Sequence, residues 1–97
     1  MLRILDEHPS IAYAVPLSID RSRAPRHELV NVGSEPLRAV TLTLLGSGLM
    51  LPGGPKTLHP GQTLDFTLRG DDLARSAVVV VRWFRPSGEQ YLWRVSF

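Results

Sequence analysis

Apolar residues recur at every second position along most of this chain of 97 residues. A period of two is that of a β-strand with one buried and one solvated face, whereas an amphipathic helix repeats every three to four residues. A helical turn has room only in "DDLARS" (71–76). The pattern therefore restricts the chain to an all-β fold. The predicted strands lie in 11–19, 28–32, 37–45, 63–68 and the hairpin 77–97, with a short apolar piece at 49–51.

Turn residues separate these segments, with Pro-Gly at 60–61 and glycine-rich stretches around 46–48 and 53–54. About seven short strands, with turn signals every eight to twelve residues, are typical of an antiparallel β-sandwich. A chain of this length buries enough surface for one core without disulfides or metal. We therefore predict a single domain over 1–97, within which 1–10 is a candidate for a flexible or loosely attached N-terminal segment.

The final hairpin allows a prediction of register. Its large apolar residues, among them Trp83, Tyr91 and Trp93, occupy odd positions. Directly paired residues share a face of the sheet, so odd residues meet odd residues only across a loop of odd length. We predict a loop of three or five residues with Trp83 opposite Trp93. The same register places Arg82 directly opposite Arg94 on the outer face.

The corner "NVGSEP" (31–36) joins two predicted strands. We expect Gly33 to supply a positive φ, Asn31 to bond the turn backbone, and Pro36 to end strand pairing just before Leu37. Each of these residues then has a structural task, and none requires a ligand. In the same way, Pro16 predicts that its strand lies at a sheet edge or contains a bulge.

Composition excludes several classes of function. There is no cysteine, which rules out disulfide frameworks, thiol nucleophiles and cysteine-ligated zinc. The formal charge is only +2 and the arginines are spread along the chain, unlike the basic patch of a dedicated nucleic-acid binder. Asp6 and Glu7 interrupt the apolar start, so it does not resemble a secretory signal, and no stretch is long enough to span a membrane. We expect a cytoplasmic protein without nucleic-acid or membrane partners, unless the chain is part of a longer, exported protein.

The residues that could hold a metal or a cofactor do not form a recognisable constellation. His8, His27 and His59 are widely spaced and are interpreted as surface or turn residues rather than metal ligands. Three further carboxylates, at positions 65, 71 and 72, are too few for calcium, which takes six to eight oxygens. We expect Asp71 and Asp72 to cap the short helical turn instead.

No catalytic constellation is recognisable either. Ser47 in "GSG" lacks the strained turn of a G-x-S-x-G nucleophile, and the glycines match no nucleotide-binding fingerprint. We therefore expect no enzyme and no cofactor.

The strongest candidate site is the outer face of the final hairpin, called the hairpin face below. One interpretation is structural: Glu35, Asp65 or Glu89 lies beside its arginines, or another strand or loop covers it. The other is a surface for a protein partner, because contiguous exposed apolar area with arginine is typical of interface cores. Both stay open on the sequence. The hairpin face comprises Val78, Val80, Arg82, Phe84, Leu92 and Arg94.

A second candidate is the loop "DRSRAPRH" (20–27), in which Arg21, Arg23 and Arg26 could hold a phosphate or sulfate. A flexible solvated loop has the same composition. We treat this loop as a possible anion-binding site beside that simpler interpretation.

The stretch Glu28 to Gly70 resembles bacterial immunoglobulin-like domains of the CARDB type. The resemblance rests on the Asn-x-Gly corner at 31–33, a Val-x-Leu strand at 40–42, and the L-x-P-G-x-T turn at 58–63. It implies an immunoglobulin-like antiparallel β-sandwich and a role in adhesion, spacing or recognition. Such domains are typically exported, which this chain's first residues do not indicate.

We predict a non-catalytic protein–protein interaction or structural module, which acts through one sheet face or through the last strand, ending at Phe97. The partner is another protein or a second copy of the chain. The alternative is a module that binds a carbohydrate or an anionic ligand. A sugar site favours exposed aromatic platforms, whereas Trp83, Tyr91 and Trp93 are predicted to face the core.

Overall fold

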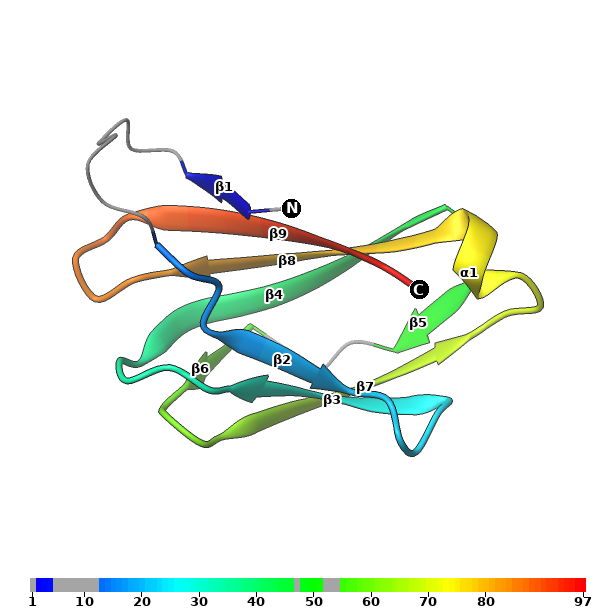
Figure 1. The fold of residues 1–97 in the computed structure, drawn as a ribbon, viewed down its shortest axis with the longest axis horizontal. Helices are drawn as coiled ribbons and strands as arrows, with labels where there is room; N and C mark the ends of the chain where they lie inside the picture. Colours follow the sequence, from blue (N-terminus) through cyan, green and yellow to red (C-terminus); the bar gives the residue numbers. More distant parts are fainter. Residues whose placement is uncertain (1, 5–12, 47, 52–54) are drawn as a thin grey trace.

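The computed structural model describes residues 2–4, 13–46, 48–51 and 55–97. Over these residues, strands form two antiparallel sheets that lie one against the other, and the all-β sandwich is confirmed (Figure 1). The five-stranded sheet has the order β1 (Leu2–Ile4), β9 (Gln90–Ser96), β8 (Ala77–Phe84), β4 (Leu37–Gly46) and β6 (Lys56–Leu58). The four-stranded sheet has the order β2 (Leu17–Asp20), β3 (Arg26–Asn31), β7 (Thr63–Arg69) and β5 (Leu49–Leu51).

The core lies between the two sheets and follows the predicted alternation. On β8 the odd positions are buried and the even ones are partly or fully exposed. On β7 the inward residues are Leu64, Phe66 and Leu68, as predicted. Trp83 is fully buried and is the largest such side chain of the described residues. The inward rows of the two sheets therefore form one continuous apolar layer, which supplies most of the favourable free energy of folding.

The first predicted strand is shorter than expected. Residues 13–16 are not in a strand, and β2 begins only after Pro16, whose carbonyl accepts a hydrogen bond from the Val32 amide at 2.8 Å. β2 forms the edge of its sheet, in agreement with the prediction from Pro16. Ile11 lies outside the described residues, as does most of the segment 1–10 that was considered loosely attached; of that segment, β1 pairs with β9.

The register of the β8–β9 hairpin is shifted from the predicted one. Each residue keeps its predicted face but pairs with a different residue of the other strand. The loop has an odd length, as expected, but Trp83 pairs with Tyr91 and Val81 pairs with Trp93. The predicted Trp83–Trp93 pair is therefore wrong. The loop is closed by Arg85, whose amide donates to the Glu89 carbonyl at 2.9 Å. Whether a residue number is odd or even determines which face of the sheet the residue occupies. The turn geometry determines whether a loop of three or of five residues forms.

Part of the last strand is already paired at the edge of its sheet. β1 pairs along β9 from Tyr91 to Trp93. Edge-to-edge pairing of a partner with this part of β9 would require β1 to leave. Pairing of a partner through the rest of the last strand, which ends at Phe97, stays a prediction.

The single helical turn is present as α1 (Leu73–Ser76). Asp72 occupies the N-cap position, but its side chain makes no cap hydrogen bond, so the predicted capping by Asp71 and Asp72 is wrong. The Ser76 hydroxyl donates to the Asp72 carbonyl at 2.7 Å instead. In the part of the chain that the structure describes, no helix has the length and apolar character needed to cross a membrane.

Gly46, at the end of β4, makes the closest backbone approach of the described glycines. Its φ is +94°, and a Cβ built on it would lie 1.7 Å from the Ser76 carbonyl oxygen. We expect Gly46→Ala to lower the free energy of unfolding by about 2 kcal/mol or more, because it combines left-handed strain with a collision against backbone. Urea unfolding followed by circular dichroism measures this.

Gly61→Ala is the matched control for that substitution. Gly61 has a φ of +82°, but nothing lies within 4 Å of a Cβ at this position. Gly61→Ala should lower the free energy of unfolding by only about 1 kcal/mol, which is the cost of a left-handed conformation without a collision. Equal losses in the two variants would contradict the collision at Gly46.

Candidate ligand cleft and interaction face

The hairpin face lies on the outer side of the five-stranded sheet. Arg82 pairs with Leu92, and Arg94 pairs with Val80, so the predicted direct opposition of the two arginines is wrong. This register spares the sheet a like-charge pair and places each guanidinium across from an apolar side chain. Both arginines are exposed, whereas Val80, Phe84 and Leu92 are partly exposed.

Neighbouring strand β4 extends the same face. Thr41 pairs with Arg82 and Arg38 pairs with Phe84, which adds a third exposed arginine. Leu45, at the far end of the strand, is 43% exposed. Among the outward-facing residues of β4, β8 and β9 there is no aspartate or glutamate. The face therefore combines apolar residues and arginines with a few neutral polar residues, among them Thr41 and Thr43.

Two of the carboxylates that were expected to compensate these arginines bind elsewhere. Glu35 forms an ion pair with Arg85, and Asp65 forms one with Arg26. Neither Arg38 nor Arg82 forms an ion pair with a described residue. The structural interpretation that these acids neutralise the face is thus not supported for Glu35 or Asp65.

The three arginines of the predicted anion loop do not converge. Arg26 pairs with Asp65 across the β3–β7 ladder, and this contact raises the pKa of Arg26. Arg23 is exposed at the tip of the β2–β3 turn. Arg21 turns toward the other sheet, where its guanidinium carbon lies 4.4 Å from the centre of the Phe97 ring. Arg21 alone of the three lines a cleft.

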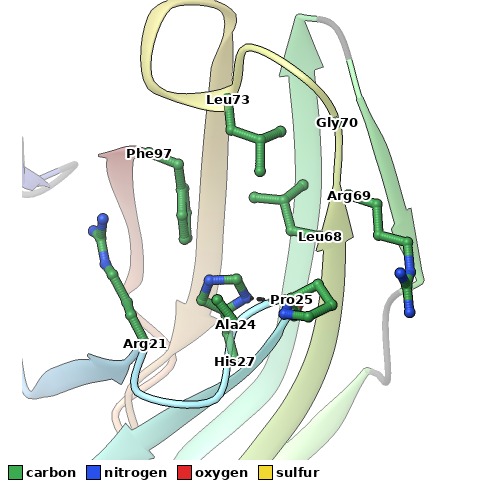
Figure 2. A pocket seen from close by; sticks show the side chains of 9 residues that line it. All are labelled: Arg21, Ala24, Pro25, His27, Leu68, Arg69, Gly70, Leu73 and Phe97. Atoms are coloured by element: carbon green, nitrogen blue, oxygen red, sulfur yellow. Dashed lines mark hydrogen bonds between the residues drawn. The ribbon is translucent and has the colours of Figure 1, made fainter.

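That cleft lies at one end of the sandwich and has a volume of about 550 Å³ (Figure 2). Figure 2 shows Arg21 and Phe97 on one side, Leu68 and Pro25 on the other, and His27 between them. The walls come from four places in the chain: the β2–β3 turn, the end of β7, α1 and the last residue described. The full lining is Arg21, Ala24, Pro25, His27, Leu68, Arg69, Gly70, Leu73 and Phe97.

His27 is the buried polar group of this cleft, with 4% of its surface exposed. Its ring stacks on Phe66 at 5.3 Å and meets the edge of Phe97 at 5.2 Å. Nδ1 lies 3.0 Å from the Pro25 carbonyl, which can only accept, so Nδ1 carries the proton and donates. The interpretation of His27 as a surface or turn residue is therefore wrong.

A sequence signal for His27 was available. His27, Leu29 and Asn31 alternate along β3, so burial of Leu29 implies that its two polar neighbours of the same parity also face inward. Both are buried. The predicted strand began at Glu28, after Arg26 and His27, so His27 was not counted in the alternation of inward residues.

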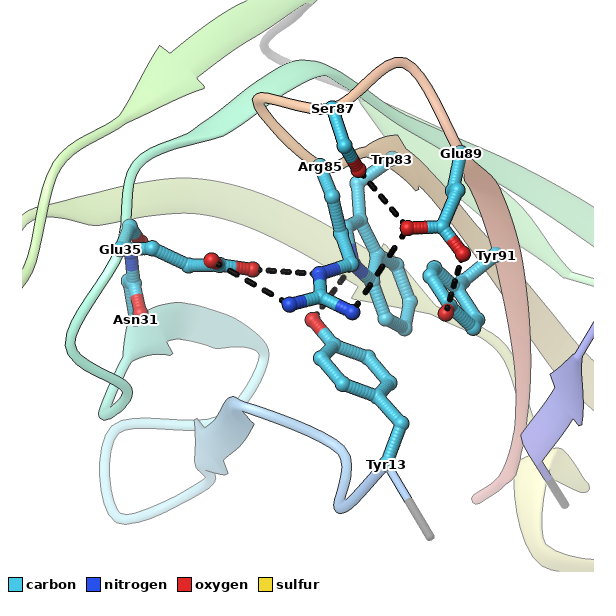
Figure 3. A network of polar contacts seen from close by, with 8 residues as sticks. All are labelled: Tyr13, Asn31, Glu35, Trp83, Arg85, Ser87, Glu89 and Tyr91. Carbon is cyan, nitrogen blue, oxygen red and sulfur yellow. Dashed lines mark hydrogen bonds and ion pairs between the residues drawn. The ribbon is translucent and has the colours of Figure 1, made fainter. Parts of the chain in front are cut away.

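The opposite end of the sandwich is closed by a polar network around the corner 31–36 (Figure 3). Asn31 is 1% exposed, and its Nδ2 donates to the Glu35 and Leu58 carbonyls, each at 2.9 Å. Its Oδ1 accepts from the Gly33 amide at 2.9 Å, which confirms the expected bond to the turn backbone. Gly33 does not have a positive φ, so that expectation is wrong; a Cβ there would lie 2.7 Å from Pro16 Cβ, so space is what requires glycine.

Aromatic rings complete this network. Tyr13 stacks on Tyr91 with 4.4 Å between ring centres, and the Trp83 indole N–H donates to the Tyr13 hydroxyl at 3.3 Å. Arg85 lies over the Tyr13 ring at 4.5 Å while its Nε donates to Glu35 at 2.6 Å. Burial raises the pKa of Tyr13, and the hydrogen bond that Arg85 donates to Glu35 raises the pKa of Arg85. The groups satisfy one another, which is typical of a structural closure.

The remaining candidate residues from the sequence are His59, His8 and Ser47. His59 is exposed in the turn before β7, as predicted, and its amide donates to the Gln62 side chain at 2.9 Å. His8 and Ser47 lie outside the described residues. Within the described ranges, no group of three His, Cys, Asp or Glu side chains could hold a metal ion.

The large aromatic rings of the β8–β9 hairpin point mainly inward. Trp83 is fully buried, Tyr91 is 3% exposed, and Trp93 packs partly against the core. The prediction that these rings face inward is confirmed for Trp83 and Tyr91.

Comparisons of the chain with protein-family models, with curated proteins and with solved structures each found no match.

Proposed function

We propose that this domain is a non-catalytic interaction module that binds an acidic protein surface through the hairpin face. The observation that carries the proposal is the composition of the outer side of β4, β8 and β9. An antiparallel sheet with a solvated outer face usually carries polar residues there. Here Val78, Val80 and Phe84 follow one another on the outward side of β8, interrupted only by Arg82.

The charge of the face favours a partner of opposite sign over a second copy. Arg38 and Arg82 are both exposed and have no ion pair with a described residue, and the outward positions of these strands carry no carboxylate. A two-fold contact through the face would bring arginines of two copies together, and like-charge contacts cost several kcal/mol. A partner with carboxylates around an apolar centre relieves both the charge and the exposed apolar area.

An immunoglobulin-like topology supports the same proposal. The order β2-β3-β7-β5 facing β4-β8-β9 corresponds to the order A-B-E-D facing C-F-G of immunoglobulin constant domains. The resemblance to CARDB-type domains is proposed on this basis together with the Asn31 corner. Many domains of this architecture serve in recognition, which makes an interaction role compatible with the fold. We propose the cytoplasm as the setting in which the domain meets its partner.

The Arg82→Glu variant tests the proposal. Tagged protein is used to capture partners from a cell lysate of the source organism, and the captured proteins are quantified by mass spectrometry. We expect one acidic partner to be captured by the wild-type chain and to be reduced at least tenfold with Arg82→Glu, because an attractive charge contact becomes repulsive. Capture should also weaken as salt is raised.

Arg23→Glu is the matched control, since Arg23 is an exposed arginine on the turn of the other sheet. It changes the net charge equally but leaves the hairpin face intact. Equal loss of the partner in both variants would mean that net charge, not this face, governs binding. A wild-type dimer that Arg82→Glu dissociates would assign the face to a second copy and contradict the acidic partner.

A further inference from the structure

We infer that Arg38 on β4 and Arg82 on the hairpin face form a clamp that binds two carboxylates of an extended acidic segment in the partner. The inference rests on the proposed function, because it concerns the same outer side of β4, β8 and β9. It adds the spacing of the charges that the partner must carry. The segment that the clamp recognises has two acidic residues separated by one residue of any kind.

The ladder between β4 and β8 places the two arginines on either side of Phe84. Arg38 pairs with Phe84, and Arg82 lies two residues before Phe84 on the same side of β8. Arg38 and Arg82 are therefore diagonal neighbours, which lie about 7–8 Å apart in a sheet. Both arginine side chains are exposed, and Phe84 is partly exposed. The two guanidinium groups and one aromatic ring thus share one accessible surface.

No carboxylate of the described residues neutralises this pair. Glu35, the acid nearest to Arg38 along the chain, accepts a hydrogen bond from Arg85 Nε at 2.6 Å. Neither Arg38 nor Arg82 forms an ion pair with a described residue. Two neighbouring cations repel each other, so a pair of carboxylates placed against them lowers the energy of both. The clamp therefore favours a ligand with two negative charges.

A β-bulge beside Arg38 is an independent sign that this spot has a role beyond packing. Of the residues that the structure describes, Ala39 is the one non-glycine residue with a positive φ, +48°. The register with β6 and with β8 shifts here, and both Arg38 and Ala39 are exposed between the buried residues 37 and 40. The core does not require the extra residue, because a regular strand has one exposed residue between two buried ones. Bulges that re-aim a side chain and strained residues are both enriched at functional sites.

The separation of the arginines matches alternate residues of an extended segment. A strand rises about 3.2–3.4 Å per residue, so side chains two residues apart stand on the same side about 6.5–7 Å apart. Two acids with one residue between them can each reach one arginine. Two adjacent acids point to opposite sides of the segment, so only one of them reaches the clamp. Guanidinium groups also bind carboxylates through paired N–H donors, which makes the contact sensitive to position.

The first test varies the spacing of the charges at constant composition. The ¹⁵N-labelled protein is titrated with the peptide acetyl-Glu-Thr-Glu-Thr-Leu-amide, and binding is followed through the amide resonances. We expect saturable shifts in residues 38–43, 80–84 and 90–94. The permuted peptide acetyl-Glu-Glu-Thr-Thr-Leu-amide has the same charge but adjacent acids, and it should bind about fivefold more weakly.

The second test varies the protein. Arg38→Gln should weaken binding of the first peptide about fivefold and should remove the preference between the two peptides, because a single arginine binds one carboxylate of either. Arg23→Gln is the matched control, since Arg23 is an exposed arginine on the turn of the other sheet. The Arg23→Gln chain should keep both the affinity and the preference of the wild-type chain.

Three results would overturn the clamp. One is the absence of saturable shifts at millimolar concentrations of the first peptide. Another is equal affinity of the wild-type chain for the two peptides, which would mean that net charge alone is recognised. The third is an Arg38→Gln chain that keeps the wild-type preference. The capture experiment with Arg82→Glu decides the proposed function separately, since a partner lost with Arg82→Glu but retained with Arg38→Gln would uphold the interaction and reject the clamp.

Discussion

Trp83→Ala is expected to lower the free energy of unfolding by about 3–5 kcal/mol. Trp83 is fully buried near the end of β8, between the two sheets, and its indole N–H donates to the Tyr13 hydroxyl. The substitution leaves a large cavity and removes that bond, and the closely packed surroundings cannot collapse to fill it. Since a domain of this size has a total stability of about 5–15 kcal/mol, much of it would be lost.

Thermal unfolding followed by circular dichroism checks this, and the melting temperature should fall by about 15 °C or more. Trp83→Phe separates the two contributions, because it keeps most of the apolar volume but loses the N–H donor; it should cost about 1–2 kcal/mol. Trp93→Ala serves as the surface-side control. Trp93 is only partly buried, and its loss should cost less than that of Trp83. If both alanine variants melted at the same temperature, the full burial of Trp83 would not contribute the stability argued here.

Asn31→Asp is expected to cost about 3 kcal/mol or more, although the two side chains have almost the same shape. Nδ2 donates to two buried carbonyls, and a carboxylate oxygen at that place would face both of them without a proton. The bond from the Gly33 amide survives, since Oδ1 remains an acceptor. The loss of unfolding free energy therefore measures the two donated hydrogen bonds and the buried charge, because the substitution leaves no cavity.

The pH dependence of Asn31→Asp gives a second readout. A buried carboxyl that faces carbonyls holds its proton more tightly in the folded chain, so its pKa is raised above the unfolded value of about 4. A group with a raised folded pKa is least destabilising below its unfolded pKa, and the penalty grows as the pH rises through the folded pKa. The difference in unfolding free energy between Asn31→Asp and wild type should therefore shrink toward low pH. A difference that is independent of pH would contradict a buried carboxylate.

Asn31→Ser provides a control without charge. It also loses the donated bonds but leaves room for water, so it should be less destabilising than Asn31→Asp at neutral pH and should show no such pH dependence. The comparison matters because Asn31 connects three parts of the fold. Its side chain bonds the corner and the end of β6, and its backbone bonds Gln62 and Gly61.

Much of the fold could be predicted from local pattern. Alternation on β7 and β8 selected the inward residues correctly, because a strand side chain has only two directions and burial favours the apolar one. The edge position of β2 followed from Pro16, which has no amide to donate. The corner at Asn31 was also predicted, since asparagine commonly bonds the backbone two residues on.

The errors share one cause. Parity says which face a residue occupies but not which partner it meets, so Trp83 was paired with Trp93 instead of Tyr91. The same ambiguity set Arg82 against Arg94. Gly33 was expected to be required for its conformation, whereas the approach of Pro16 from another segment requires it. Each of these outcomes depends on geometry that the parity of a residue does not encode: the turn for the hairpin register, and the approach of Pro16 for Gly33.

At the candidate cleft, too, local pattern identified some residues but not the contacts that they make. Arg21 was identified as part of a basic loop with Arg23 and Arg26, yet the structure separates the three and places Arg21 beside Phe97, from the other end of the chain. His27 was assigned to the surface because its segment is polar, although it stacks on Phe66 across the β3–β7 ladder. The sequence by itself determined most of the strands, their faces and the core, because these follow from a period of two and from the burial of apolar surface; the short strands β1 and β6 lie outside the predicted ones. Only the tertiary structure decided which arginine meets which ring and where a polar group is enclosed, because those contacts join segments whose approach no local pattern encodes.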